Sequence, residues 1–194
     1  MKNHKEIIRK IIHILFGIAI ILGFQFLEWA IFIRFLFILS LVVVFLTLLH
    51  IKYKIGAIEY FSKEEEKKFP LKGILFFIAG CALVMYIFNK DIALATITIL
   101  TFGDSVSCLA SYFGSRYKLN PFRKYKSLFG SICGFVVAFI FSLMFIDPFS
   151  ALVGSFFGML AESLTIKLGE SDADDNLIMP LIAATAMYLL SKII

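Results

Sequence analysis

The sequence predicts an all-α integral membrane protein: a single-domain helical bundle over residues 1–194 with about seven transmembrane helices. Three observations predict this class. Hydrophobic residues make up 60% of the chain and charged residues only 17%, and the mean hydropathy is +0.93. This composition leaves too little polar sequence to cover a soluble domain. In addition, the apolar residues fall in runs that approach the ~20 residues a membrane-spanning helix needs.

Seven apolar runs are expected to form helices. They are residues 11–27, 29–49, 73–88, 92–114, 129–146, 149–166 and 177–194. The first run lies near the start of the chain, but no small-residue cleavage site follows it, so we expect a retained helix and not a secretory signal.

The basic residues predict the orientation of the bundle. With a cytoplasmic amino terminus, all but three of the 19 Lys and Arg residues fall in cytoplasmic segments; the exceptions are Arg34, Lys90 and Lys192. Cytoplasmic loops beside transmembrane helices are rich in Lys and Arg. The pattern therefore favours an amino terminus inside, a carboxyl terminus outside and contact with anionic lipid headgroups, with no nucleic-acid partner.

The three cysteines, Cys81, Cys108 and Cys133, each stand alone inside an apolar run, without CxxC or Cys/His spacing. We interpret them as small buried hydrophobic residues.

Two carboxylates, Asp104 and Glu162, lie inside predicted helices, near their cytoplasmic ends. A carboxylate at helix-centre depth costs about 2.5 to 3.5 kcal/mol even on the lenient insertion scale, so a functional role is the first hypothesis. Asp104 belongs to a segment rich in small residues, TFGDSVSCLASYFGS, which would let a ligand or another helix approach its backbone.

Two basic motifs are expected at the same membrane face. In RKIIH, Arg9 and His13 are four residues apart and share a helix face, although positive-inside anchoring would also explain them. In KSLFGSICG, Lys126, Ser127 and backbone N–H groups at a helix start would suit a phosphate. The same segment contains GxxxG, a helix-packing motif, and both roles are compatible.

An acidic segment, AESLTIKLGESDADDNLIMP, completes this face. Its carboxylates could form an ordinary solvated turn with a helix N-cap at Asp175 or Asn176. Because a basic loop suited to binding phosphate is expected beside them, a metal site is favoured over a solvated turn. Carboxylates that recruit Mg²⁺ and basic groups that hold phosphates are the two halves of a nucleotide-dependent phosphotransfer site. The sequence has neither a Walker loop nor a protein-kinase glycine loop, so such a site would be of another kind.

In their order and spacing, RKIIH, GDSVSCLASYFGS, KSLFGS, and AES followed by DDNLIMP resemble the CTP-dependent lipid-alcohol kinases, which include dolichol or polyprenol kinases, phytol kinases and CTP-using diacylglycerol kinases. The resemblance spans nearly the whole chain. It implies a multi-helix membrane enzyme that moves the γ-phosphoryl group of CTP to a lipid hydroxyl with Mg²⁺ or a similar divalent ion.

The resemblance also implies roles for individual residues. Asp104 matches the aspartate of a GD motif and is assigned as catalytic base or metal ligand, and His13 would orient phosphate or substrate. The expected metal ligands are Asp104, Glu162, Asp174 and Asp175, with Lys126 as a catalytic phosphate-neutralising residue. The expected nucleotide-binding residues are Arg9, Lys10, Ser127, Gly130, Ser131 and Asn176.

The chain departs from the family pattern in two places. Ser107, Ser111 and Ser115 follow the GD aspartate where an alanine and spaced glycines are frequent, and Phe129 replaces an acidic residue. These departures concern the nucleotide geometry and are compatible with a variant donor or acceptor.

The acceptor is expected to be a polyprenol, a dolichol or a related isoprenoid alcohol, with diacylglycerol, phytol and geranylgeraniol as alternatives. A cytidylyltransferase that forms a CDP-lipid would use similar groups, a transporter would also bury charges, and a purely structural membrane protein would leave Asp104 and Glu162 without a use. A homodimer is also expected.

Overall fold

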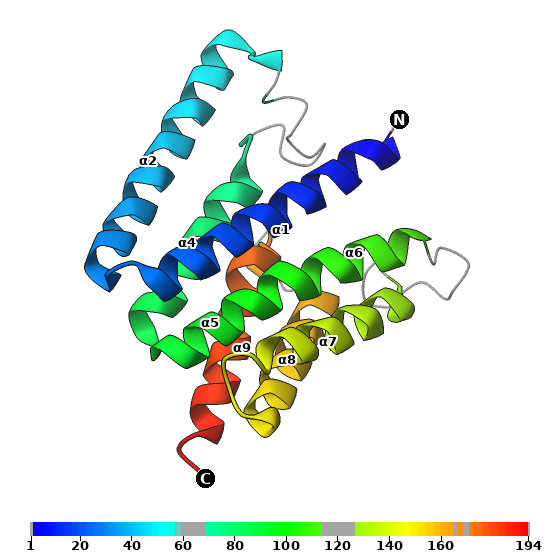
Figure 1. Cartoon of the computed structure of the whole chain (residues 1–194). Helices are drawn as coiled ribbons and strands as arrows, with labels where there is room; N and C mark the ends of the chain where they lie inside the picture. The colour runs from blue at the N-terminus through cyan, green and yellow to red at the C-terminus, as the bar shows by residue number, and fades with distance from the viewer. Residues whose placement is uncertain are drawn as a thin grey trace.

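The computed structural model describes residues 2–56, 58, 69–113, 127–164, 167–168 and 171–193. Within them the chain is almost entirely helical, which confirms the all-α membrane class (Figure 1). The helices are α1 (Lys2–Phe26), α2 (Trp29–Tyr53), α4 (Lys72–Ile87), α5 (Lys90–Thr98), the π-helix η2 (Ile99–Gly103), α6 (Asp104–Phe113), α7 (Leu128–Ser142), α8 (Pro148–Ser163) and α9 (Asp175–Leu190).

Each of the seven predicted segments contains a helix. Three helical stretches, Lys5–Phe26, Trp29–Tyr53 and Lys90–Phe113, are long and apolar enough to cross a membrane. The third is continuous through α5, η2 and α6, and we call it the α5–α6 rod. The other four helices have 15 or 16 residues, just below the ~17 at the short end of membrane-spanning lengths. The number of membrane crossings therefore stays a prediction.

A short β-hairpin interrupts the helices in the acidic segment. Strand β1 (Lys167–Leu168) pairs antiparallel with β2 (Ser171–Asp172), with Lys167 opposite Asp172. The apolar run at residues 149–166 was predicted to be helical throughout, but α8 ends at Ser163 and its C-cap, Leu164, is extended. The change follows the end of the apolar run, because polar residues and a glycine replace it from Lys167 onward.

Two hydrogen bonds between helices mark the two ends of the bundle. The indole of Trp29, at the start of α2, donates a 3.3 Å hydrogen bond to the carbonyl of Met85, near the end of α4. At the opposite end, the side chain of Asn176 donates a 3.1 Å bond to the carbonyl of Gly73, so α4 and α9 begin together. Figure 1 shows the two termini at opposite ends of the molecule. We call the end that contains the first turns of α1, α4, α7 and α9 the amino-terminal end.

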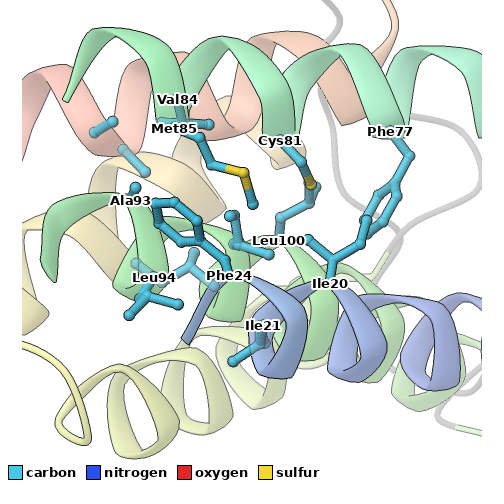
Figure 2. Close-up of a cluster of buried hydrophobic side chains, with 14 of the residues drawn as sticks. Ile20, Ile21, Phe24, Phe77, Cys81, Val84, Met85, Ala93, Leu94 and Leu100 are labelled. Atoms are coloured by element: carbon cyan, nitrogen blue, oxygen red, sulfur yellow. The ribbon is translucent and has the colours of Figure 1, made fainter. Parts of the chain in front are cut away.

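A large part of the buried apolar core lies between α1, α4 and the α5–α6 rod (Figure 2). The rod is its centre, because every residue from Ile92 to Leu100 is buried. Cys81 has no exposed surface in this core, as expected for a small hydrophobic residue. Cys108 and Cys133 are only partly buried, so the prediction that all three cysteines are buried was wrong for these two. The side chains labelled in Figure 2 are Ile20, Ile21, Phe24, Phe77, Cys81, Val84, Met85, Ala93, Leu94 and Leu100. Such packing fixes the rod relative to α1 and α4.

Candidate functional site

Asp104 lies at the start of α6, immediately after the π-helix η2, and forms a buried ion pair with Lys10 of α1. The Lys10 ammonium donates a hydrogen bond to Oδ2 of Asp104. The two side chains are only 11% and 8% exposed. Removing two charges from water is unfavourable unless they are paired with good geometry, so each group depends on the other.

His13 adjoins the same carboxylate from one helical turn further along α1. Its Nε2 atom lies 3.9 Å from Oδ2 of Asp104. The imidazole also makes an edge-on contact with the ring of Phe77 on α4, with 4.4 Å between centroids. Phe77 is 2% exposed, so the histidine ring is held between an apolar wall and a carboxylate. We call Lys10, His13 and Asp104 the Asp104 cluster.

A second set of polar contacts lies one turn closer to the amino-terminal end. Arg9 donates a 2.7 Å hydrogen bond from Nη1 to Oε2 of Glu6, and the two side chains are 20% and 37% exposed. The other carboxylate oxygen of Glu6 lies 3.5 Å from Sγ of Cys108 on α6. Ionisable groups therefore continue along the contact between α1 and α6, from the partly exposed Glu6 to the buried Asp104.

The start of α7 is joined to α6 by serine hydroxyls. Ser127 is the N-cap of α7, and its Oγ accepts a 2.9 Å hydrogen bond from the backbone N–H of Gly130. Its own N–H and hydroxyl donate to Oγ of Ser111, at 3.0 and 3.2 Å. A side chain at Gly130 would overlap Ser111, so Gly130 allows the two helices to touch. Ser131 follows in the first turn of α7, and Lys126 lies outside the described residues.

The acidic segment caps α9. The N-cap is Asp174, one residue earlier than the sequence suggested, and its carboxylate accepts a 3.1 Å hydrogen bond from the N–H of Asn176. Asp175 is in the first turn, where a negative charge is favoured by the helix dipole. The side chain of Asn176 is directed to Gly73 of α4.

Glu162 has no exposed surface and lies in the last turn of α8, at the amino-terminal end of the bundle. Among the described residues, no three His, Cys, Asp or Glu side chains gather in a way that could hold a metal ion. A ready-made metal cage built from Asp104, Glu162, Asp174 and Asp175 is therefore not present in the described part of the chain. Mg²⁺ in phosphotransfer sites is usually held by one or two carboxylates together with substrate phosphates, and the Asp104 carboxylate fits that arrangement.

The structure thus brings Lys10, His13 and Asp104 together and places Arg9 beside them. Ser127 and Gly130 form a separate contact with α6, and Asp174 and Asn176 belong to the junction of α9 with α4. Two residues that contact Arg9 or His13 were not predicted as part of the site. Glu6 could have been found from its spacing of three residues before Arg9, a favourable ion-pair spacing on a helix. Phe77 lies in an ordinary apolar run, and nothing in the sequence distinguishes it as a neighbour of the site.

Two characterised proteins are similar to this chain. CTP-dependent diacylglycerol kinase 1 of Schizosaccharomyces pombe is 27% identical over 145 residues, which cover 65% of this chain and 63% of that protein. The chloroplastic farnesol kinase of Arabidopsis thaliana is 29% identical over an alignment that covers 96% of this chain and 66% of that protein. These matches confirm the resemblance to lipid kinases, and the chain spans about two thirds of the length of each relative.

No protein-family model matches the chain. No solved structure matches it either.

Proposed function

We propose that this chain is a membrane-embedded kinase that transfers the γ-phosphoryl group of CTP to the hydroxyl of a lipid alcohol. The observation that carries the proposal is the Asp104 cluster, which places a carboxylate, an ammonium and an imidazole together inside an apolar bundle. Ionisable groups buried in a membrane protein mark functional sites by default, because the bilayer disfavours them. The similarity to two lipid kinases supports the donor and the class of acceptor.

Asp104 is proposed to act on the acceptor hydroxyl. As the alcohol oxygen bonds to the γ-phosphorus, its proton must leave, and a buried carboxylate held by Lys10 is a suitable acceptor. The bond between the γ-phosphorus and the bridging oxygen breaks, and CDP departs with the electron pair. His13, fixed against Phe77, would orient the hydroxyl or the transferred phosphoryl group.

Phosphate binding is assigned to the basic residues at the amino-terminal end. Lys10 pairs with Asp104, and Arg9, the preceding residue of α1, pairs with Glu6. Both would neutralise phosphate charge, which is the main requirement of phosphoryl transfer. Lys126, Ser127, Gly130 and Ser131 are the other proposed contacts. Ser127 already caps α7, so its contribution would be to fix the helix start whose remaining N–H groups face the nucleotide.

A divalent cation, Mg²⁺ in the first instance, would supply further neutralisation of the phosphate oxygens when bound. In the alternative to its role as the base, the Asp104 carboxylate would be one of the ligands of this cation. Glu162, Asp174 and Asp175 remain proposed ligands, and Asn176 a proposed nucleotide contact, from the same end of the bundle.

An isoprenoid alcohol is the proposed acceptor, with polyprenol or dolichol first. Farnesol is itself an isoprenoid alcohol, and the similarity to the farnesol kinase extends over 96% of this chain, against 65% for the diacylglycerol kinase. Diacylglycerol, phytol and geranylgeraniol are the alternative acceptors. The chain is proposed to be a single domain whose amino-terminal end faces the cytoplasm. It is also proposed to form a homodimer.

A panel assay tests this function. Purified protein in lipid nanodiscs would receive CTP, Mg²⁺ and one of farnesol, a polyprenol, dolichol, phytol or diacylglycerol. The expected result is a phosphorylated isoprenoid alcohol, formed only when the divalent ion is present. Absence of phosphorylated product with every acceptor, from protein that remains folded, would reject the kinase.

A further inference from the structure

The π-helix η2 is enclosed by glycines from three neighbouring helices. Gly17 of α1 lies against Thr101. A Cβ atom added at Gly134 of α7 would be 2.7 Å from the carbonyl oxygen of Gly103 in η2. A Cβ atom added at Gly158 of α8 would be 3.1 Å from the side chain of Ile99. A π-helix is wider than an α-helix, is rare, and is frequent at functional sites. The missing side chains make room for this wider turn immediately before Asp104.

Gly17 shares one face of α1 with the Asp104 cluster. Lys10, His13 and Gly17 are three and four residues apart in succession, which places them in line along the helix. Thr101 precedes Asp104 by three residues on the antiparallel rod. Three successive contacts therefore join the same two helices: Glu6 with Cys108, Lys10 and His13 with Asp104, and Gly17 with Thr101.

A side chain at position 17 would force these two helices apart. A methyl group there would overlap the hydroxyl and methyl of Thr101. Rotating Thr101 would not relieve the overlap, because its Cβ atom is also only 2.7 Å from the position of the added carbon. Non-bonded carbons prefer about 3.5 to 4.0 Å, so α1 would have to shift by on the order of 1 Å.

We propose that Gly17 is a positioning residue: its close approach to Thr101 sets the distance of Lys10 and His13 from the Asp104 carboxylate. The catalytic consequence rests on the proposed function, whereas the effect on the ion pair does not. Displacement of a reacting group by about 1 Å can reduce a rate ~10²-fold, so Gly17 would control turnover without touching the substrate.

Gly23 offers a matched control on the same helix. A methyl group at Gly23 would overlap the ring of Phe32 on α2, not the α5–α6 rod. Gly23→Ala therefore introduces the same helix-interior alanine and a comparable overlap, but leaves the approach of α1 to Asp104 unchanged.

The first readout is the energetic coupling between Lys10 and Asp104, measured by a double-mutant cycle of Lys10→Met and Asp104→Asn on thermal unfolding. The cycle is run in three backgrounds: unchanged, Gly17→Ala and Gly23→Ala. The expected result is that the coupling falls to less than about half in Gly17→Ala and is retained in Gly23→Ala. Coupling that persists undiminished in Gly17→Ala would overturn the inference whether or not the protein is a kinase.

The second readout is turnover. Gly17→Ala should lower kcat by about 10- to 100-fold and change the pH profile of kcat, whereas Gly23→Ala should leave both close to the unchanged protein. Equal loss of kcat in the two variants would contradict a positioning role. If Gly17→Ala does not fold, the Gly17→Ala, Thr101→Ala double variant is compared with Thr101→Ala alone. Alanine at position 101 removes the two closest contacts but keeps the Cβ atom, 2.7 Å from the added carbon, so the coupling should still be lower in the double variant. Equal coupling in these two variants would overturn the inference as well.

Discussion

Lys10 of α1 and Asp104 of α6 lie 94 residues apart in the sequence and meet in a buried ion pair. The pair joins the first helix of the chain to the turn at which the α5–α6 rod changes from π-helix to α-helix. Buried ion pairs are weak evidence for stability, because an apolar pair of similar volume is often as stable or more so. A pair retained in an apolar bundle therefore indicates a function that needs the charges.

Removal of one partner should be far more damaging to stability than removal of both. Lys10→Met would leave an uncompensated buried carboxylate and should destabilise the protein by about 3 to 5 kcal/mol. The Lys10→Met, Asp104→Asn double variant should recover much of this loss while remaining inactive. Thermal unfolding in detergent measures the first effect and phosphoryl transfer the second. Equal stability of the single and double variants would mean that the two charges are not coupled.

Asp104→Asn alone leaves Lys10 without a counter-charge and should lower stability, less than Lys10→Met does, but the protein should still fold and should lose the chemistry. Asparagine has nearly the same shape and can still accept a hydrogen bond from Lys10, but it is neither a base nor a good metal ligand. Turnover should fall by at least ~10²-fold, the scale seen when one preorganised electrostatic group is removed. Ser105→Ala, at the neighbouring buried position, is the control and should stay active. Near-normal turnover in Asp104→Asn would remove the centre of the mechanism.

The fold class and the position of most helices were predictable because hydrophobic runs of membrane length have few alternatives. The position of Asp104 inside a long apolar helix was predictable for the same reason, and its depth in the membrane stays a prediction. Its partner was not, because a pairing across 94 residues depends on how α1 packs against the rod. Lys10 was therefore expected as a phosphate ligand only, and the structure adds its contact with the carboxylate.

Other features were hidden for local reasons. The π-helix η2 has an ordinary apolar sequence, ILTFG, and arises from the neighbouring helices that accommodate it. Ser127 as the N-cap of α7 follows a known preference and was within reach of the sequence. The position of Lys126 and much of the basic loop lies outside the described residues, so its proposed role stays a prediction.

The orientation of the bundle can be tested by cysteine labelling in intact membranes, with the natural cysteines replaced. Lys54→Cys, at the C-cap of α2, should react only from the cytoplasmic side, because the basic residues cluster at that end of the helices. Glu28→Cys and Asp147→Cys, at the opposite ends, should react only from outside. The reverse pattern would place the Asp104 cluster at the outer face, away from cytoplasmic CTP.

Asp147 should make stability depend on pH without affecting activity. As the N-cap of α8, its carboxylate accepts hydrogen bonds from the N–H groups of Phe149 and Ser150, both at 3.0 Å. The hydrogen bonds from Ser150 hold the pKa of Asp147 below its ordinary value. The folded pKa is thus lower than the unfolded one, so the stabilisation is present above the unfolded pKa and is lost as the pH falls through the folded pKa.

Asp147→Asn should remove this pH dependence, and Asp147→Ala should reduce stability by about 1 kcal/mol near neutral pH. Thermal unfolding between pH 3 and 7, roughly the range over which an Asp carboxylate titrates, measures both effects. If stability depends on pH identically in Asp147→Asn and in the unchanged protein, titration of Asp147 does not contribute to the free energy of unfolding.

The central claim is that a neutral lipid hydroxyl attacks the γ-phosphorus of CTP. A cytidylyltransferase would instead present a phosphorylated lipid to the α-phosphorus and release pyrophosphate. The most direct measurement supplies CTP labelled at either the α- or the γ-phosphate together with a polyprenol or farnesol, and follows the label into the lipid fraction. Our account predicts γ-label in the lipid, none of the α-label, and release of CDP. Entry of α-label and cytidine into the lipid, with the γ-label found in pyrophosphate, would contradict it.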